Sequence, residues 1–223
     1  MELLSPVQVR ILGCLVEKER TTPDNYPLTM NGLLSACNQA TNRHPVMTLS
    51  EPAVASALEN LRAGGLARIV YSRSNRADKY RHVLDETLSL DPGETALLGM
   101  LMLRGPQTTA ELRSRTERLH AFSEPADLET TLERMAVRSE PLVVRLGRGA
   151  GQKEARWAHL LSGRPDPGDL PPPPAPSAGG RVDRLEALEA TVAGLTRELE
   201  RLRADHEALA SELGVAPVDP PPA

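Results

Sequence analysis

An internal repeat constrains the fold more than any other feature of the sequence. The tetrapeptide Ser-Glu-Pro-Ala begins at Ser50 and again at Ser123. After each copy, apolar residues recur at the spacing of one helix face, and a β-branched run and a polar turn follow. A β-branched run that ends in such a turn is typical of a hairpin. The chain is therefore expected to build two similar modules.

Helix-start signals place the helices of each module. Ser5-Pro6-Val7-Gln8 is a capping box with proline at the first helical position, and Asp91-Pro92-Gly93-Glu94 shows the same pattern. Thr29 and Thr108 start the middle helices. The predicted helices cover residues 5–20, 29–39, 50–63, 91–104, 108–118 and 123–137, and the predicted strands cover 66–70, 79–84, 142–145 and 154–160.

Three helices with a terminal hairpin form the winged-helix arrangement. The sequence therefore predicts a mainly α fold with small β-hairpin wings, in the α+β class. It divides into a first winged-helix domain at residues 1–88 and a second at 89–161. A proline-rich linker is expected at 162–180, because seven prolines there exclude helix and sheet. The last residues, 214–223, are expected to be a disordered tail.

Residues 181–213 are predicted to form a coiled-coil helix. Apolar residues follow a 3,4 spacing over four heptads. The predicted dimerisation residues are Leu185, Leu188, Val192, Leu195, Leu199, Leu202, His206, Leu209 and Leu213. In a parallel pair Arg184 would face Glu189 of the second copy, and Glu198 would face Arg203, so a parallel homodimer is favoured. An antiparallel pair, or a stripe that docks on another protein, remains open.

Composition excludes several classes of function. Five aromatic residues leave little for a base-stacking platform, which disfavours single-strand nucleic-acid readers. Two cysteines and five histidines lie at no metal-ligand spacing, and none of them sits in a motif with a plausible nucleophile and base. We expect no catalytic residue, no metal and no cofactor, and hence no enzyme. No apolar run is long enough for a membrane span and no secretory signal is evident, so we expect a soluble, cytoplasmic protein.

Long motifs also resemble a known family. Residues 17–51, 104–122 and 151–161 are similar to the YceH-type family of bacterial proteins, and the match extends over nearly the whole chain. The resemblance implies a tandem winged-helix fold, with a C-terminal coiled coil that some members carry. It implies no catalytic residues and no ligand, because that family has no assigned biochemical activity.

Charge distinguishes the wings from the helices. The helices at 50–63 and 123–137 would enter the major groove in such a module, but both carry net negative charge and are poor readers of DNA. They are more simply packing helices with a solvated acidic face. The two hairpins instead carry net charges of +4 and +3. The candidate DNA-binding residues are Arg43, Arg68, Arg73, Arg76, Lys79, Arg81, Arg145, Arg148, Lys153 and Arg156.

Two functions fit these observations. The first is a dimeric, non-enzymatic protein that binds duplex DNA weakly through basic wings, as a regulator or nucleoid-associated factor. The alternative is a protein-interaction scaffold without DNA binding, in which the wing arginines simply pair with neighbouring carboxylates. The loop at residues 21–27, an insertion relative to the second half, is expected to be an ordered plug more often than a binding loop.

Overall fold

The computed structural model describes residues 2–71, 77–147, 154–165 and 206. The chain divides into a unit at residues 1–172 and a second unit at 173–223. In the second unit only His206 is described, and it is helical and exposed. The rest of the predicted linker beyond residue 165, the rest of the coiled coil and the tail lie outside the described residues.

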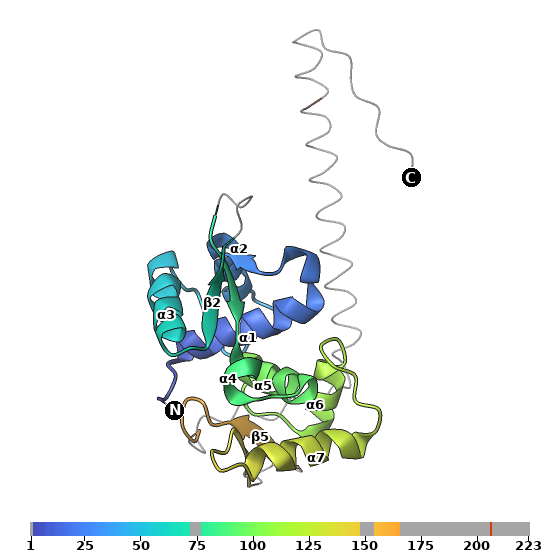
Figure 1. Cartoon of the computed structure of the whole chain (residues 1–223). Coiled ribbons are helices and arrows are strands. Elements are labelled where there is room, and N and C mark those ends of the chain that lie inside the picture. The colour runs from blue at the N-terminus through green and yellow to red at the C-terminus, as the bar shows by residue number, and fades with distance from the viewer. Residues whose placement is uncertain (1, 72–76, 148–153, 166–205, 207–223) are drawn as a thin grey trace. The chain divides into compact units, whose positions relative to one another are not determined.

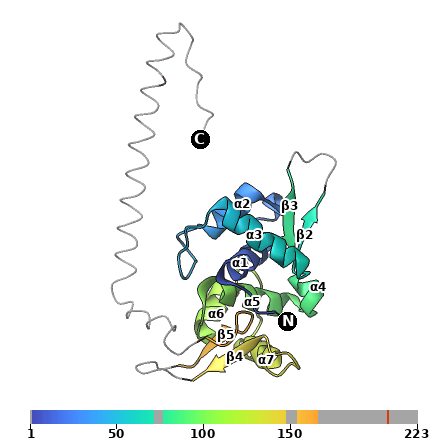
Figure 2. The same cartoon turned by 90° about the vertical axis from the view of Figure 1, so that its left-hand side faces the viewer.

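The first repeat consists of helices followed by a hairpin (Figures 1 and 2). Its elements are α1 (Pro6–Thr21), the 3₁₀ turn η1 (Pro23–Asn25), β1 (Leu28–Thr29), α2 (Met30–Cys37), α3 (Glu51–Ala63), β2 (Ala67–Val70), β3 (Lys79–His82) and α4 (Leu84–Leu88). All three predicted helices and both strands are present. Neither β1 nor α4 is among the elements predicted from the sequence.

The second repeat has the same order of elements. It consists of α5 (Pro92–Arg104), α6 (Thr109–Thr116), α7 (Pro125–Ala136), β4 (Val143–Leu146) and β5 (Arg156–His159). The described chain is thus a mixed α and β structure with seven α-helices and two small antiparallel sheets. The α+β assignment is confirmed at this level.

A short extra segment pairs with each hairpin, as the strand β1 in the first repeat and as a single-residue bridge in the second. In the first repeat the strand order is β1-β3-β2, and Tyr80 lies opposite both Leu28 and Ile69. In the second repeat β4 pairs with β5, and Gln107 forms a bridge to Trp157 through hydrogen bonds of 3.0 and 2.7 Å between their main chains. Each extra segment directly precedes a helix that a threonine side chain caps, at Thr29 and Thr108.

Side-chain caps fix most of the helix starts. The predicted capping boxes at Ser5 and Asp91 are both formed, and Thr108 forms a third with Glu111. The two Ser-Glu-Pro-Ala copies differ. Helix α3 begins after Ser50 as expected, whereas α7 begins one residue later because Glu124 is its N-cap and donates its main-chain N–H to the Asp127 carboxylate at 3.0 Å.

The two repeats share one hydrophobic core, in which α1 packs against α5. The crossing relies on a glycine in each helix. A Cβ atom at Gly13 would lie 2.8 Å from the Leu103 side chain, and one at Gly99 would lie 2.5 Å from Cγ1 of Val16. The predicted boundary at residues 88 and 89 falls directly after α4, yet the repeats are joined into one compact unit by this contact.

Candidate nucleic-acid interface

The β2–β3 hairpin lies beside α3 in both views (Figures 1 and 2). At its base, Arg68 and Arg81 both pair with one carboxylate, Glu86 of α4, and the Arg68 Nη1 lies 2.9 Å from Glu86 Oε2. All three side chains are substantially exposed, so each pair contributes little to stability. Two guanidinium groups share one carboxylate, and this cluster therefore keeps a net positive charge.

Lys79 begins β3, next to the segment that closes the hairpin. No carboxylate among the described residues lies within ion-pair distance of its ammonium group. The candidates Arg73 and Arg76 fall in the segment 72–76, outside the described residues. Arg68 and Arg81 pair with Glu86, whereas Lys79 forms no ion pair with a described carboxylate.

The second hairpin exposes Arg145. Its guanidinium carbon lies 5.9 Å from the ring centroid of the buried Trp157, directly across the β4–β5 ladder. Stacking on the indole positions the guanidinium at the surface without neutralising it. The candidates Arg148 and Lys153 fall in the segment 148–153, outside the described residues.

Two candidate arginines are buried instead of exposed. Arg43 is only 6% exposed, and its Nη2 lies 2.6 Å from Oε2 of Glu17. Burial opposes the charged form, but the hydrogen bonds that Arg43 donates to the Glu17 carboxylate raise the pKa of Arg43. Arg156 is 5% exposed, and its Nη1 lies 3.1 Å from Glu111 Oε2 and 2.9 Å from the Pro106 carbonyl. Neither presents its guanidinium to solvent, so neither Arg43 nor Arg156 is available to bind DNA at the surface.

The exposed faces of α3 and α7 offer no free cation for base contacts. Arg62 of α3 pairs with Glu59 at 2.5 Å. Arg134 of α7 pairs with Asp91 and, at 3.1 Å, with Glu94 of the α5 capping box. These contacts agree with the interpretation of both helices as packing helices with acidic surfaces.

The loop at residues 21–27 has a structural role. The main-chain N–H of His82 in β3 donates to the Tyr26 hydroxyl at 2.9 Å, and burial raises the pKa of that hydroxyl. The His82 ring lies 3.1 Å from Glu19 at the end of α1. The loop thus ties β3 to α1, as expected for an ordered plug.

Cys14 and Cys37 are both buried. A hydrogen bond between the two thiols, together with burial, raises the pKa of Cys37. In the part of the chain that the structure describes, no group of three or more His, Cys, Asp or Glu side chains is placed to hold a metal ion. None of the described helices has the length and apolar character needed to cross a bilayer.

Comparison with known proteins shows that this chain has bacterial relatives. The family model described as "Protein of unknown function, DUF480" matches residues 4–152. A UPF0502 protein of Geobacter sulfurreducens is 49% identical over 199 residues, which cover 86% of this chain and 90% of the relative. A UPF0502 protein of Burkholderia pseudomallei is 43% identical over 217 residues, which cover 95% of this chain and 90% of the relative.

Proposed function

We propose a DNA-binding function for this chain, which belongs to the DUF480 family. In this proposal the chain is a non-enzymatic, dimeric tandem winged-helix protein that binds duplex DNA weakly through its two basic hairpins. Its role would be regulatory or nucleoid-associated. The winged-helix assignment is supported by the repeated order of three helices and an antiparallel hairpin.

One observation carries the proposal: both repeats place a cation with no carboxylate partner among the described residues on an equivalent hairpin. In the first repeat this cation is Lys79, and in the second it is Arg145. The sequence adds Arg73 and Arg76 to one hairpin and Arg148 and Lys153 to the other. Cations spaced along a hairpin suit a phosphate strand, which carries a negative charge at regular intervals.

The geometry favours binding to phosphates over reading of bases. The helices that would enter the major groove expose carboxylates and keep their arginines in ion pairs. A surface of this kind gives affinity without a strong sequence preference, and such affinity falls steeply with salt. The coiled coil at 181–213 would bring two such surfaces together, so binding by both would exceed the affinity of one.

The test compares two double variants by fluorescence anisotropy with a labelled mixed-sequence duplex. Arg76→Gln with Lys79→Gln removes two charges from the first hairpin, and Arg113→Gln with Arg118→Gln removes two exposed charges from α6 and the turn that follows it. We expect micromolar binding at about 50 mM salt that is largely lost at about 200 mM, and a loss of at least about tenfold in the hairpin variant alone. Equal losses in both variants, or no binding at either salt, would refute the proposal.

A second candidate function is a protein-interaction scaffold. The pairing of Arg68 and Arg81 with Glu86 favours it, because ion pairs of this kind are ordinary surface chemistry and need no nucleic acid. The scaffold predicts no anisotropy change with duplex DNA at either salt. It also predicts a protein partner whose binding tolerates salt.

A further inference from the structure

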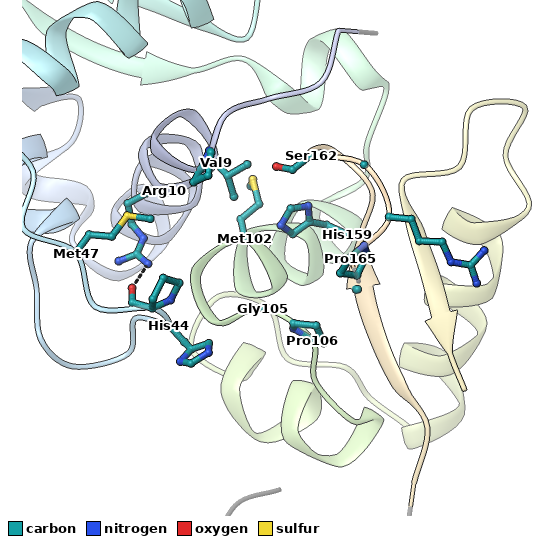
Figure 3. A pocket seen from close by; sticks show the side chains of 15 residues that line it. Val9, Arg10, His44, Met47, Met102, Gly105, Pro106, His159, Ser162 and Pro165 are labelled. Carbon is teal, nitrogen blue, oxygen red and sulfur yellow. Dashed lines mark hydrogen bonds between the residues drawn. The ribbon is translucent and has the colours of Figure 1, made fainter. Parts of the chain in front are cut away.

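A cavity of about 520 Å³ opens where the two repeats meet. Its walls come from α1, the loop after α2, the end of α5 and the residues after it, β5 and the residues that follow β5 (Figure 3). Its volume lies in the range of small-molecule sites, which are about 300–1,000 Å³. Because both repeats contribute side chains, a bound molecule would contact both of them.

The walls are largely apolar. Val9 of α1 and Met102 of α5 line the cavity together with Met47, Pro106 and Ala158. Figure 3 shows the side chains of Val9, Met102 and His159 facing the same space. Methionine side chains are flexible and polarizable, so walls of this kind adapt to an apolar body of variable shape.

The charge of the lining has one sign. No aspartate or glutamate lines the cavity, whereas Arg10, Arg164, His44 and His159 do. Arg10 is 2% exposed and forms no ion pair with the described residues. Its Nη2 donates to the Pro45 carbonyl at 2.5 Å and its Nη1 to the Cys37 carbonyl at 3.4 Å, while its buried Nε has no hydrogen-bond partner.

A buried guanidinium without a carboxylate is costly, because its desolvation is not repaid by an opposite charge. Burial accordingly lowers the pKa of Arg10. Arg43, by contrast, has Glu17 as its buried partner. The lone cation beside an apolar cavity is therefore positioned to be compensated by an anion that enters from outside.

His159 supplies a second polar group. Its Nδ1 is buried and has no partner among the described residues. Burial lowers the pKa of His159 to about 4, so its ring is neutral near pH 7 and carries one N–H donor and one acceptor nitrogen. Figure 3 places this ring beside Met102 and Ser162.

We propose that this cavity binds a small organic carboxylate, with the carboxylate on Arg10 and its apolar body against Val9, Met47 and Met102. A planar anion of single charge would accept hydrogen bonds from the Nη–H groups of the guanidinium that the Cys37 and Pro45 carbonyls leave free. A phosphate group would carry more charge, and Arg10 is the one buried cation of the described lining. This proposal is independent of the proposed DNA binding, and its test measures ligand binding in the absence of DNA.

The test uses the full chain labelled with [¹³C-methyl]methionine and observed by NMR. Met47 and Met102 line the cavity, while Met135 lies in the core of the second repeat and serves as an internal control. The probes are benzoate, 2-naphthoate, indole-3-acetate and octanoate, each paired with its neutral amide. We expect at least one acid to shift the Met47 and Met102 signals saturably below about 1 mM, and its amide to bind at least about tenfold more weakly.

Two variants distinguish the contribution of the Arg10 charge to binding from the contribution of the cavity volume. Arg10→Gln is expected to remove the preference for acid over amide. Ser162→Trp changes an exposed residue at the rim, and it is expected to block acid and amide alike while the Met135 signal stays in place. No shift with any of the four acids at about 5 mM would overturn the proposal. Equal binding of acid and amide would overturn the carboxylate assignment even if the Arg10 variant does not fold.

Discussion

Replacing Gly99 with alanine inserts a methyl group into the crossing of α5 and α1. The new Cβ would lie 2.5 Å from Cγ1 and 3.1 Å from Cβ of Val16. These atoms sit close to the α1 main chain, so the two helices must separate. Overpacking of this kind costs about 1–3 kcal/mol. The gain in helix propensity from glycine to alanine offsets about 1 kcal/mol of that cost, so we expect the free energy of unfolding to fall by about 0–2 kcal/mol.

Urea denaturation followed by far-UV circular dichroism measures this change. Gly32→Ala in α2 is the matched control, because its nearest neighbour, Thr29 Oγ1, is 3.5 Å away and in ordinary contact. The control is expected to raise the free energy of unfolding by about 0.5–1 kcal/mol.

A double-mutant cycle locates the clash. With Val16→Ala in place, the cost of Gly99→Ala is expected to disappear, giving a coupling of about 1 kcal/mol or more. Stabilisation by Gly99→Ala alone, equal to that of the Gly32→Ala control, would refute the close contact between the repeats.

Arg43→Gln is expected to lower the free energy of unfolding by about 3–5 kcal/mol, because the Glu17 carboxylate keeps only the more distant Lys18, whose Nζ lies 3.6 Å away. The double variant with Glu17→Gln should lose less, and urea denaturation measures both. For His159, burial lowers the pKa to about 4, below the unfolded value of about 6.5, so the unfolded state binds more protons between these values and stability falls as the pH drops through that range. His159→Gln is expected to remove this contribution, and a wild-type-minus-variant difference that is constant from pH 7 to 5 would contradict it. Leu199→Asp is expected to convert a dimer to a monomer in sedimentation, because it places a charge in the predicted coiled-coil seam, and an unchanged dimer would disprove the seam.

Local chemistry explains why the sequence predicts the order of elements. A capping box such as Asp91 with Glu94 acts within four residues, and helix periodicity acts within one face. Hairpins follow from β-branched runs that end in polar turns. The extra strand β1 could not be predicted in this way. Two residues are too few to show the alternation of a strand, and β1 depends on its pairing with β3.

The burial of charged residues depends on contacts between distant segments. Arg43 meets Glu17 across 26 positions, and Arg156 meets Glu111 across 45. No local pattern distinguishes these arginines from the exposed Arg145. The sequence also does not show that Arg10 lacks an ion-pair partner. That depends on which carboxylates α1 faces once α1 and α5 have packed together.

The salt dependence of duplex binding tests the central claim most directly. Each phosphate neutralised by a cation contributes a slope of about −0.9 in log K against log salt concentration. We predict that Arg73→Gln, Arg76→Gln and Lys79→Gln together make the slope of the full-length protein shallower by about 3. A slope that the triple variant leaves unchanged, or the absence of binding by the wild-type protein at about 50 mM salt, would contradict DNA binding through the hairpins.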